Sequence, residues 1–117
     1  LKAEHKENLD FNTKVSISLE EPNKREERLK KSKAQPEMAY VTQLAFKRNP
    51  DVVAEVLSLA KGYCNQCGKE APFTRSSDGT PYLEVHHIIF LANGGDDTVE
   101  NSEALCPNCH REMHFGL

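Results

Sequence analysis

The sequence contains no tryptophan and no apolar run near the roughly 18 residues that a membrane-spanning helix requires. Only 38% of its 117 residues are hydrophobic, and its mean hydropathy is -0.64. A chain of this length fits one compact domain with an additional arm, and its apolar core must be small. We therefore expect a structural metal ion to help stabilise the fold.

A net positive charge is also absent, although it is typical of proteins that bind nucleic acids. The formal net charge is -3, and the charges are unevenly distributed. Residues 22–50 contain eight Lys or Arg and three Glu, whereas residues 51–117 contain four Lys or Arg and ten Asp or Glu. Attraction of phosphate would then come from the N-terminal half and from a bound metal ion. The alternative for the basic run at 24–33 is a solvated helix face with Glu/Lys pairs.

Residues 1–48 are expected to form an N-terminal arm. Val15–Leu19 alternates apolar and polar side chains, which predicts a short half-buried strand. Residues 23–34 have the composition of a basic helical segment with almost no apolar face. After Pro36, apolar side chains at helical spacing favour a further helix, although a strand that begins at Tyr40 fits the same residues.

Residues 49–117 are expected to form a separate domain. Asn49, as an N-cap before a proline, predicts the start of a helix. Gly62 stands where that helix needs a left-handed C-terminal cap. Further patterns predict strands at 81–89 and 104–105 and a final helix from Pro107 to about Met113.

The four cysteines form two Cys-x-x-Cys pairs, Cys64 with Cys67 and Cys106 with Cys109. Gly68 follows the first pair and suits a tight turn that lets backbone amides face the thiolates. The sequence shows no basic-then-apolar leader. We expect a reducing cytoplasm, where paired cysteines are typical of metal ligands rather than disulfides. Four thiolates would hold one zinc ion with no open coordination position, which makes this zinc structural.

One alternative remains for the second cysteine pair. Cys106-x-x-Cys109-His110 also matches an attachment sequence for c-type haem. That interpretation requires a secreted chain and leaves Cys64 and Cys67 without a role. It also predicts a strong Soret absorption band, which a zinc protein lacks.

The histidines offer a second metal position. His110 and His114 are four residues apart and share one face if this segment is helical. Cys109 then points about 100 degrees away around the same helix, so one helix can serve two metal positions. His86 and His87 are adjacent and would face opposite sides of a regular strand. Both can reach one phosphate only if the strand ends or bulges there.

The order of these residues resembles that of the HNH nucleases, also called the His-Me-finger or ββα-metal family. The resemblance covers about half the chain and runs through Glu84-Val85-His86-His87, a polar loop, Asn101, and Cys106-x-x-Cys109-His110-x-x-x-His114. It implies an α+β fold. A ββα-metal (HNH) finger, stabilised by a zinc site of four cysteines, would be preceded by helices and the N-terminal arm.

The resemblance also implies a role for each matched residue. His86, His110 and His114 would hold a catalytic divalent ion. His87 would be the general base, and Asn101 would brace the loop that carries it.

Three positions leave details open. The family often has proline where this chain has Phe90, and a larger apolar residue where it has Ser102, so the loop geometry is undecided. Glu84 would share a strand face with His86 and is either a partner of the site or a solvent-facing residue.

The function implied by the resemblance is that of a metal-dependent DNA endonuclease leaving 5′-phosphate and 3′-hydroxyl ends. His87 would take a proton from the attacking water, since histidine titrates near neutral pH. One divalent ion would stabilise the phosphorane and the leaving group. Imidazole ligands suit Mn²⁺, Ni²⁺ or Zn²⁺ better than Mg²⁺, so we expect activity with Mn²⁺ or Mg²⁺, with Mn²⁺ the better.

The number of copies of the chain that act together would determine whether the DNA is nicked or cut through both strands. A monomer has one active site and would nick DNA, whereas double-strand cleavage needs a homodimer or two binding events. The alternative function is a non-catalytic zinc-ribbon module that binds nucleic acid, in which the histidines are incidental.

Overall fold

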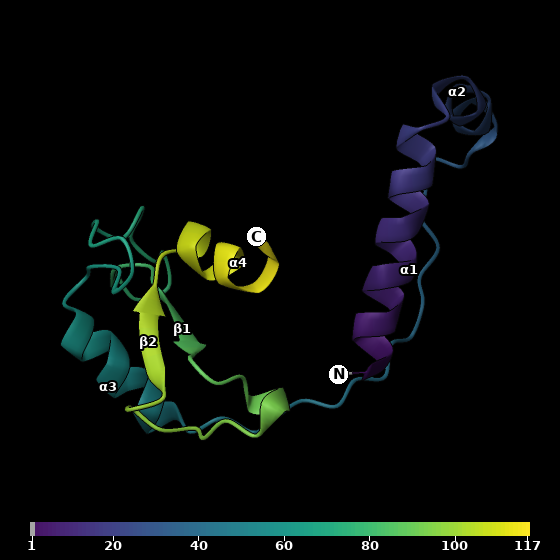
Figure 1. The fold of residues 1–117 in the computed structure, drawn as a ribbon. Helices are drawn as coiled ribbons and strands as arrows, with labels where there is room; N and C mark the ends of the chain where they lie inside the picture. The colour runs from purple at the N-terminus through teal and green to yellow at the C-terminus, as the bar shows by residue number, and fades with distance from the viewer. Residues whose placement is uncertain (1) are drawn as a thin grey trace. The chain divides into compact units, whose positions relative to one another are not determined.

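The computed structural model describes residues 2–117, with side chains described from residue 10 onward. The chain divides into two compact units, a first unit that ends at Ala45 and a second unit, Phe46–Leu117. No helix in the described part of the chain is long and apolar enough to span a membrane. Figure 1 shows the elements of both units.

The first unit consists of two helices, α1 (Lys2–Leu19) and α2 (Pro22–Lys31). The predicted strand at Val15–Leu19 is therefore wrong, because these residues form the C-terminal part of α1. A strand needs a neighbouring strand to pair its backbone groups, and the described part of this unit contains none. A helix pairs these groups within itself.

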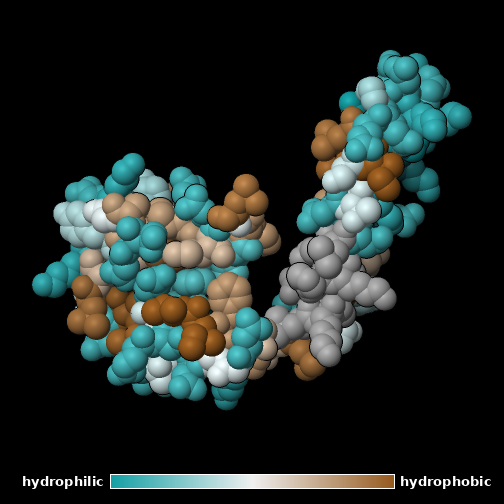
Figure 2. Space-filling model, viewed as in Figure 1, coloured by the Kyte–Doolittle hydropathy of each residue, from teal (hydrophilic) through white to brown (hydrophobic). Residues whose placement is uncertain are grey.

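Helix α2 corresponds to the basic segment expected at residues 23–34. It buries no side chain, and its end of the unit is hydrophilic in Figure 2. Lys30 lies 3.3 Å from Glu27 and 4.0 Å from Glu26, which are the Glu/Lys pairs of a solvated helix face.

Residues 33–49 form neither a helix nor a strand, so the helix expected after Pro36 is wrong. Its apolar side chains lie in solvent, and Met38, Tyr40 and Leu44 are each at least 80% exposed. Helical spacing alone does not stabilise a helix when its apolar face has nothing to pack against.

The second unit begins with α3 (Pro50–Ala60). The side chain of Asn49 accepts a hydrogen bond from the Asp51 amide at 2.9 Å, as expected of an N-cap. Lys61 and Gly62 have φ angles of 52° and 86°, so the left-handed ending predicted at Gly62 is confirmed.

The centre of the second unit is an antiparallel pair of strands, β1 (Glu84–His87) and β2 (Ser102–Leu105). The 3-10 helix η1 (Leu91–Asn93) lies in the connection between them, and α4 (Pro107–Phe115) follows β2. Both α3 and α4 contact the sheet. Strand β1 is shorter than the predicted 81–89. Its last pair is His87 with Ser102, and beyond it the amide and carbonyl of Ile89 bond the side chain of Asn101 instead of the backbone of a strand.

The core is small, as the composition predicts. One face of α3 packs against the start of β1, the end of β2 and the first cysteine pair; its buried residues are Val52, Val56, Ala60, Cys64, Leu83, Ala104 and Leu105. All the described buried core residues belong to the second unit. The α+β class and the ββα order of β1, β2 and α4 are confirmed.

Candidate metal centres and active site

The four cysteines gather at one point, and their sulfur atoms lie within 4.8 Å of one another. Cys64 and Cys67 follow α3, and Cys106 and Cys109 begin α4. The amide of Cys67 points at Cys64 Sγ at 3.5 Å, and the amide of Cys109 points at Cys106 Sγ at 3.4 Å. Gly68, with a φ of 72°, closes the first turn as predicted. Four sulfur donors in this arrangement match a tetrahedral zinc site.

The electrostatics of this cluster fit a bound cation. Burial alone would raise the pKa of Cys64, but the amides of Cys67, Cys106 and Gln66 lower it to about 6. Burial and the neighbouring sulfurs raise the pKa of Cys109 to about 12. Adjacent thiolates repel one another, so all four can be charged together only beside a positive ion.

A backbone contact joins the two cysteine pairs across the 38 residues that separate them in the sequence. The Asn65 amide donates to the Ala104 carbonyl at 2.8 Å, and the Ala104 amide donates to Asn65 Oδ1 at 2.7 Å. Asn65 thus holds the first pair against β2, which leads directly into the second pair. Cys64 and Cys67 thereby share a site with the other pair, whereas the haem interpretation left them without a role.

Three histidines form a second cluster, as the sequence predicts. Ring nitrogens of His86, His110 and His114 lie within 4.8 Å of one another. The Nε2 atoms of His110 and His114 are 3.1 Å apart. His86 is only 4% exposed, and burial together with the two neighbouring rings lowers its pKa. Neutral imidazole is the form that binds a metal ion, so the cluster suits a divalent cation.

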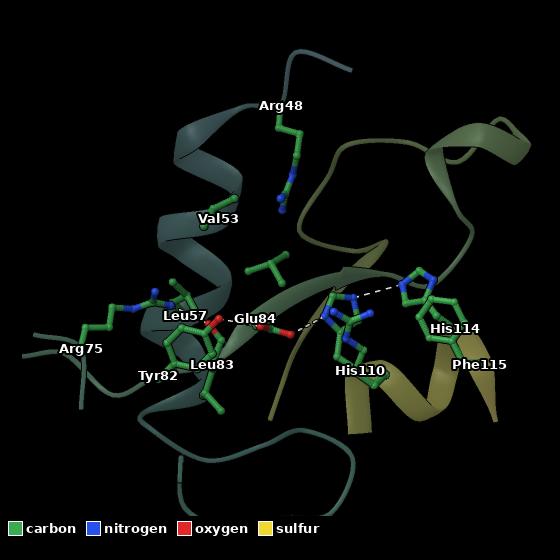
Figure 3. A pocket seen from close by; sticks show the side chains of 12 residues that line it. Arg48, Val53, Leu57, Arg75, Tyr82, Leu83, Glu84, His110, His114 and Phe115 are labelled. Carbon is green, nitrogen blue, oxygen red and sulfur yellow. Dashed lines mark hydrogen bonds and ion pairs between the residues drawn. The ribbon is translucent and has the colours of Figure 1, made fainter. Parts of the chain in front are cut away.

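Glu84 orients one of these imidazoles. Its Oε1 atom lies 2.8 Å from His110 Nδ1, and its Oε2 atom accepts from the Tyr82 hydroxyl at 2.6 Å, as Figure 3 shows. Burial opposes ionisation, but these two hydrogen bonds leave the pKa of Glu84 lowered. The charged carboxylate keeps the proton of His110 on Nδ1 and leaves Nε2 facing the cluster. Glu84 is therefore a partner of His110 in this cluster rather than a solvent-facing residue.

His87 has a carboxylate partner that sequence analysis missed. Its Nε2 atom lies 2.9 Å from Asp97 Oδ1, and Asp97 Oδ2 accepts from the Asn49 amide at 2.6 Å. These two contacts lower the pKa of Asp97. An Nε2 proton directed at the carboxylate leaves the Nδ1 lone pair of His87 available to accept a proton. The only hint in the sequence was the pair of aspartates in the polar loop.

Strand β1 ends at His87. His86 and His87 can serve one site only where the strand ends or bulges, and this strand end meets that condition. The loop that follows is held by Asn101. Its side chain accepts from the Ile89 amide at 2.9 Å and donates to the carbonyls of Ile89 and Asp96 at 3.0 and 2.8 Å. A Cβ at Gly95 would collide with the Ile89 carbonyl, so this closure requires glycine there.

The two departures from the family pattern both have contacts in this loop. The Phe90 ring stacks on His114 with centroids 4.7 Å apart and meets the edge of His86 at 5.5 Å. The Ser102 hydroxyl donates to the Thr98 carbonyl at 2.6 Å. Phe90 therefore covers the histidine cluster, and Ser102 secures the end of the loop.

A two-stranded antiparallel sheet followed by a helix, with histidines from a strand and the helix converging beside a cluster of four cysteines, defines a domain of the ββα-metal nuclease class. The comparison with known families agrees: residues 64–116 match the HNH endonuclease family, and this part of the chain is an HNH endonuclease domain.

Known relatives include restriction enzymes. The chain is 50% identical over 93 residues to the type IV methyl-directed restriction enzyme EcoKMcrA of Escherichia coli, a match that covers 74% of this chain and 33% of that protein. It is 42% identical over 31 residues to anaredoxin of a Nostoc species, covering 26% of this chain and 41% of anaredoxin. The chain thus spans about a third of the length of EcoKMcrA.

A solved structure has a similar fold. It is that of the type IV phosphorothioation-dependent restriction endonuclease ScoMcrA, with a TM-score of 0.52 and 35% sequence identity. The match covers 59% of this chain and 14% of ScoMcrA.

Proposed function

We propose that this chain hydrolyses phosphodiester bonds in DNA, as the nuclease portion of a restriction-type endonuclease. The observation that carries the proposal is the convergence of His86, His110 and His114 in an HNH domain whose next histidine, His87, is held by a carboxylate. A zinc ribbon that only binds nucleic acid would need neither the three converging imidazoles nor the oriented fourth.

In the proposed reaction, His87 accepts a proton from the attacking water through Nδ1. Asp97 holds the ring in this tautomer and stabilises the imidazolium that forms. His86, His110 and His114 would hold the catalytic ion through nitrogens that face one another. When bound there, a divalent ion supplies positive charge to a nonbridging oxygen and to the departing 3′ oxygen, where negative charge is greatest in the transition state.

The donor set also supports a preference among metals. Three imidazoles suit Mn²⁺ better than Mg²⁺, which prefers oxygen ligands. We therefore expect cleavage with either ion, faster cleavage with Mn²⁺, and ends that carry 5′-phosphate and 3′-hydroxyl groups. Equal rates with the two ions would contradict this ranking.

We propose DNA as the substrate and leave its modification open, because the two restriction relatives differ in the modification that they require. EcoKMcrA is methyl-directed and ScoMcrA is phosphorothioation-dependent, so they share restriction of DNA but differ in the modification. Unmodified, methylated and phosphorothioated plasmids therefore belong in the same assay. A single copy of this chain would nick such a plasmid, and linear product would indicate paired copies.

The decisive experiment is relaxation of supercoiled plasmid with Mn²⁺, Mg²⁺ or a chelator. We expect His87→Ala to lower the cleavage rate by about 10² to 10⁴-fold while the variant still binds Mn²⁺, because it loses only the proton acceptor. His5→Ala, which changes a histidine outside the residues that match the HNH family, is the matched control. Wild-type protein that binds every plasmid form but cuts none would favour the non-catalytic module.

A further inference from the structure

A pocket of about 580 Å³ lies beside the histidine cluster, within the second unit. Val53 and Leu57 line it from α3, and His110 and His114 line it from α4. Consecutive residues 82–85 also line it. In the described part of the chain the sheet has two strands, so β1 has one edge without a strand beside it. Glu84 and Val85, the first two residues of β1, point to opposite faces of the strand, and because both line the pocket, it lies at this edge. Figure 3 shows α3 and α4 on either side of the space.

The charge in this pocket is opposite to that of the surrounding unit. Residues 51–117 contain four Lys or Arg and ten Asp or Glu. Both arginines among those four, Arg75 and Arg111, line the pocket, and Arg48 lines it from just before α3. The one acidic residue in its wall is Glu84, which already pairs with His110. A unit with excess negative charge therefore gathers its arginines beside the proposed metal position.

None of the three arginines forms an ion pair with a carboxylate among the described side chains. Arg75 is held by a hydrogen bond from Nη2 to the Leu83 carbonyl at 2.7 Å and lies over the Tyr82 ring. Arg111 lies 5.6 Å from the Phe115 ring centroid. Arg48 points into the pocket from the start of α3 (Figure 3). A guanidinium has five N–H donors, so each arginine retains donors for an anion.

We propose that this pocket binds phosphates of the DNA backbone that adjoin the bond being cut, an inference that rests on the proposed function. Arginine recognises phosphate through paired N–H groups, and phosphate contacts position a nucleic acid without reading its sequence. A backbone that follows the free edge of β1 passes from Arg48 to His110 and His114. Of the three arginines, Arg48 belongs to the basic residues 22–50 that were expected to attract phosphate, whereas Arg75 and Arg111 come from the acidic residues 51–117.

The test measures how salt weakens DNA binding. A short fluorescein-labelled duplex is titrated with the full 117-residue chain in Mn²⁺, in a His87→Ala background that prevents cutting, at about 50 to 200 mM salt. Arg48→Gln and Arg111→Gln are compared with the parent protein. Lys69→Gln is the matched control, because it removes a charge of the same unit outside the pocket. Arg75 is left unchanged, because its bond to the Leu83 carbonyl supports the fold.

Each arginine variant is expected to bind more weakly and to lower the slope of log Kd against log salt by about 0.9, while Lys69→Gln leaves both unchanged. Slopes equal to the parent's in both arginine variants, with normal zinc content, would overturn the inference. Equal losses in Lys69→Gln would overturn it as well, since the effect would then be general charge. Wild-type cleavage is measured separately, so its failure would count against the proposed function, whereas an unchanged slope beside normal cleavage would count against the pocket alone.

Discussion

At the scale of single residues, the site depends on oriented imidazoles rather than on histidines alone. Glu84 directs His110 and Asp97 directs His87, each through one ring nitrogen. The histidines were predicted from their order in the sequence. The role of Asp97 was not predicted, because the sequence does not show which of the two adjacent aspartates in the polar loop lies beside His87.

Asp97→Asn is expected to lower the cleavage rate by about tenfold or more, since the imidazolium of His87 loses its carboxylate. Asp96→Asn is the matched control, because the contact of Asp96 with Asn101 uses its backbone carbonyl. Parallel plasmid assays of both variants measure the difference. Equal rates for the two variants would remove Asp97 from the proposed role.

The same pair has a predictable pH dependence. The contacts from His87 and the Asn49 amide lower the pKa of Asp97, so the native protein keeps this carboxylate charged below the usual aspartate range. Its stabilising effect is therefore complete above the unfolded pKa of about 3.9 and is lost as the pH falls through the lowered native pKa.

At the scale of elements, local signals predicted the second unit well and the first unit poorly. Asn49 and Gly62 act through neighbouring backbone groups, so the limits of α3 could be predicted from the sequence. The alternation at Val15–Leu19 is a weak signal, because whether such a segment pairs as a strand depends on partners elsewhere in the chain. The apolar residues after Pro36 failed to form a helix for a related reason, since Met38 and Tyr40 are fully exposed and form no apolar face that packs against the described side chains.

The small core makes the start of β1 sensitive to truncation. Leu83 is 2% exposed and contacts the α3 face, so Leu83→Ala is expected to lower the free energy of unfolding by about 2 to 5 kcal/mol. Leu59→Ala, at a position 62% exposed on α3, should change it by less than about 0.5 kcal/mol. Urea unfolding of both variants with zinc present measures these values. Similar losses in the two variants would contradict the assigned core.

At the scale of the whole molecule, the two units differ in what stabilises them. The described buried core has seven residues, all in the second unit, and one of them is Cys64. A core of this size contributes little stability, so the four-cysteine cluster must hold the first cysteine turn, β2 and α4 together. The match to the HNH family, residues 64–116, lies within the second unit.

Cys106→Ser is accordingly expected to lose zinc and to abolish the cooperative unfolding transition of the second unit, because metal binding and folding are coupled. His110→Ala changes the other cluster and should retain one zinc ion per chain. Elemental analysis and thermal unfolding of both variants distinguish the clusters. Zinc retained by Cys106→Ser, or lost from His110→Ala, would mean that the structural ion lies elsewhere.

The four-cysteine cluster, the three-histidine cluster and the limits of α3 could be inferred from the chain alone, because each depends on spacing within a few residues or on a recurrent order of residues. The pairing of His110 with Glu84 joins residues 26 apart, and the contact of Asp97 with Asn49 joins residues 48 apart. These contacts, and the arginines gathered around the pocket, exist only after the four-cysteine cluster and the strand register bring distant segments together. Spacing in a sequence carries no direct measure of such distances, so folding alone establishes them.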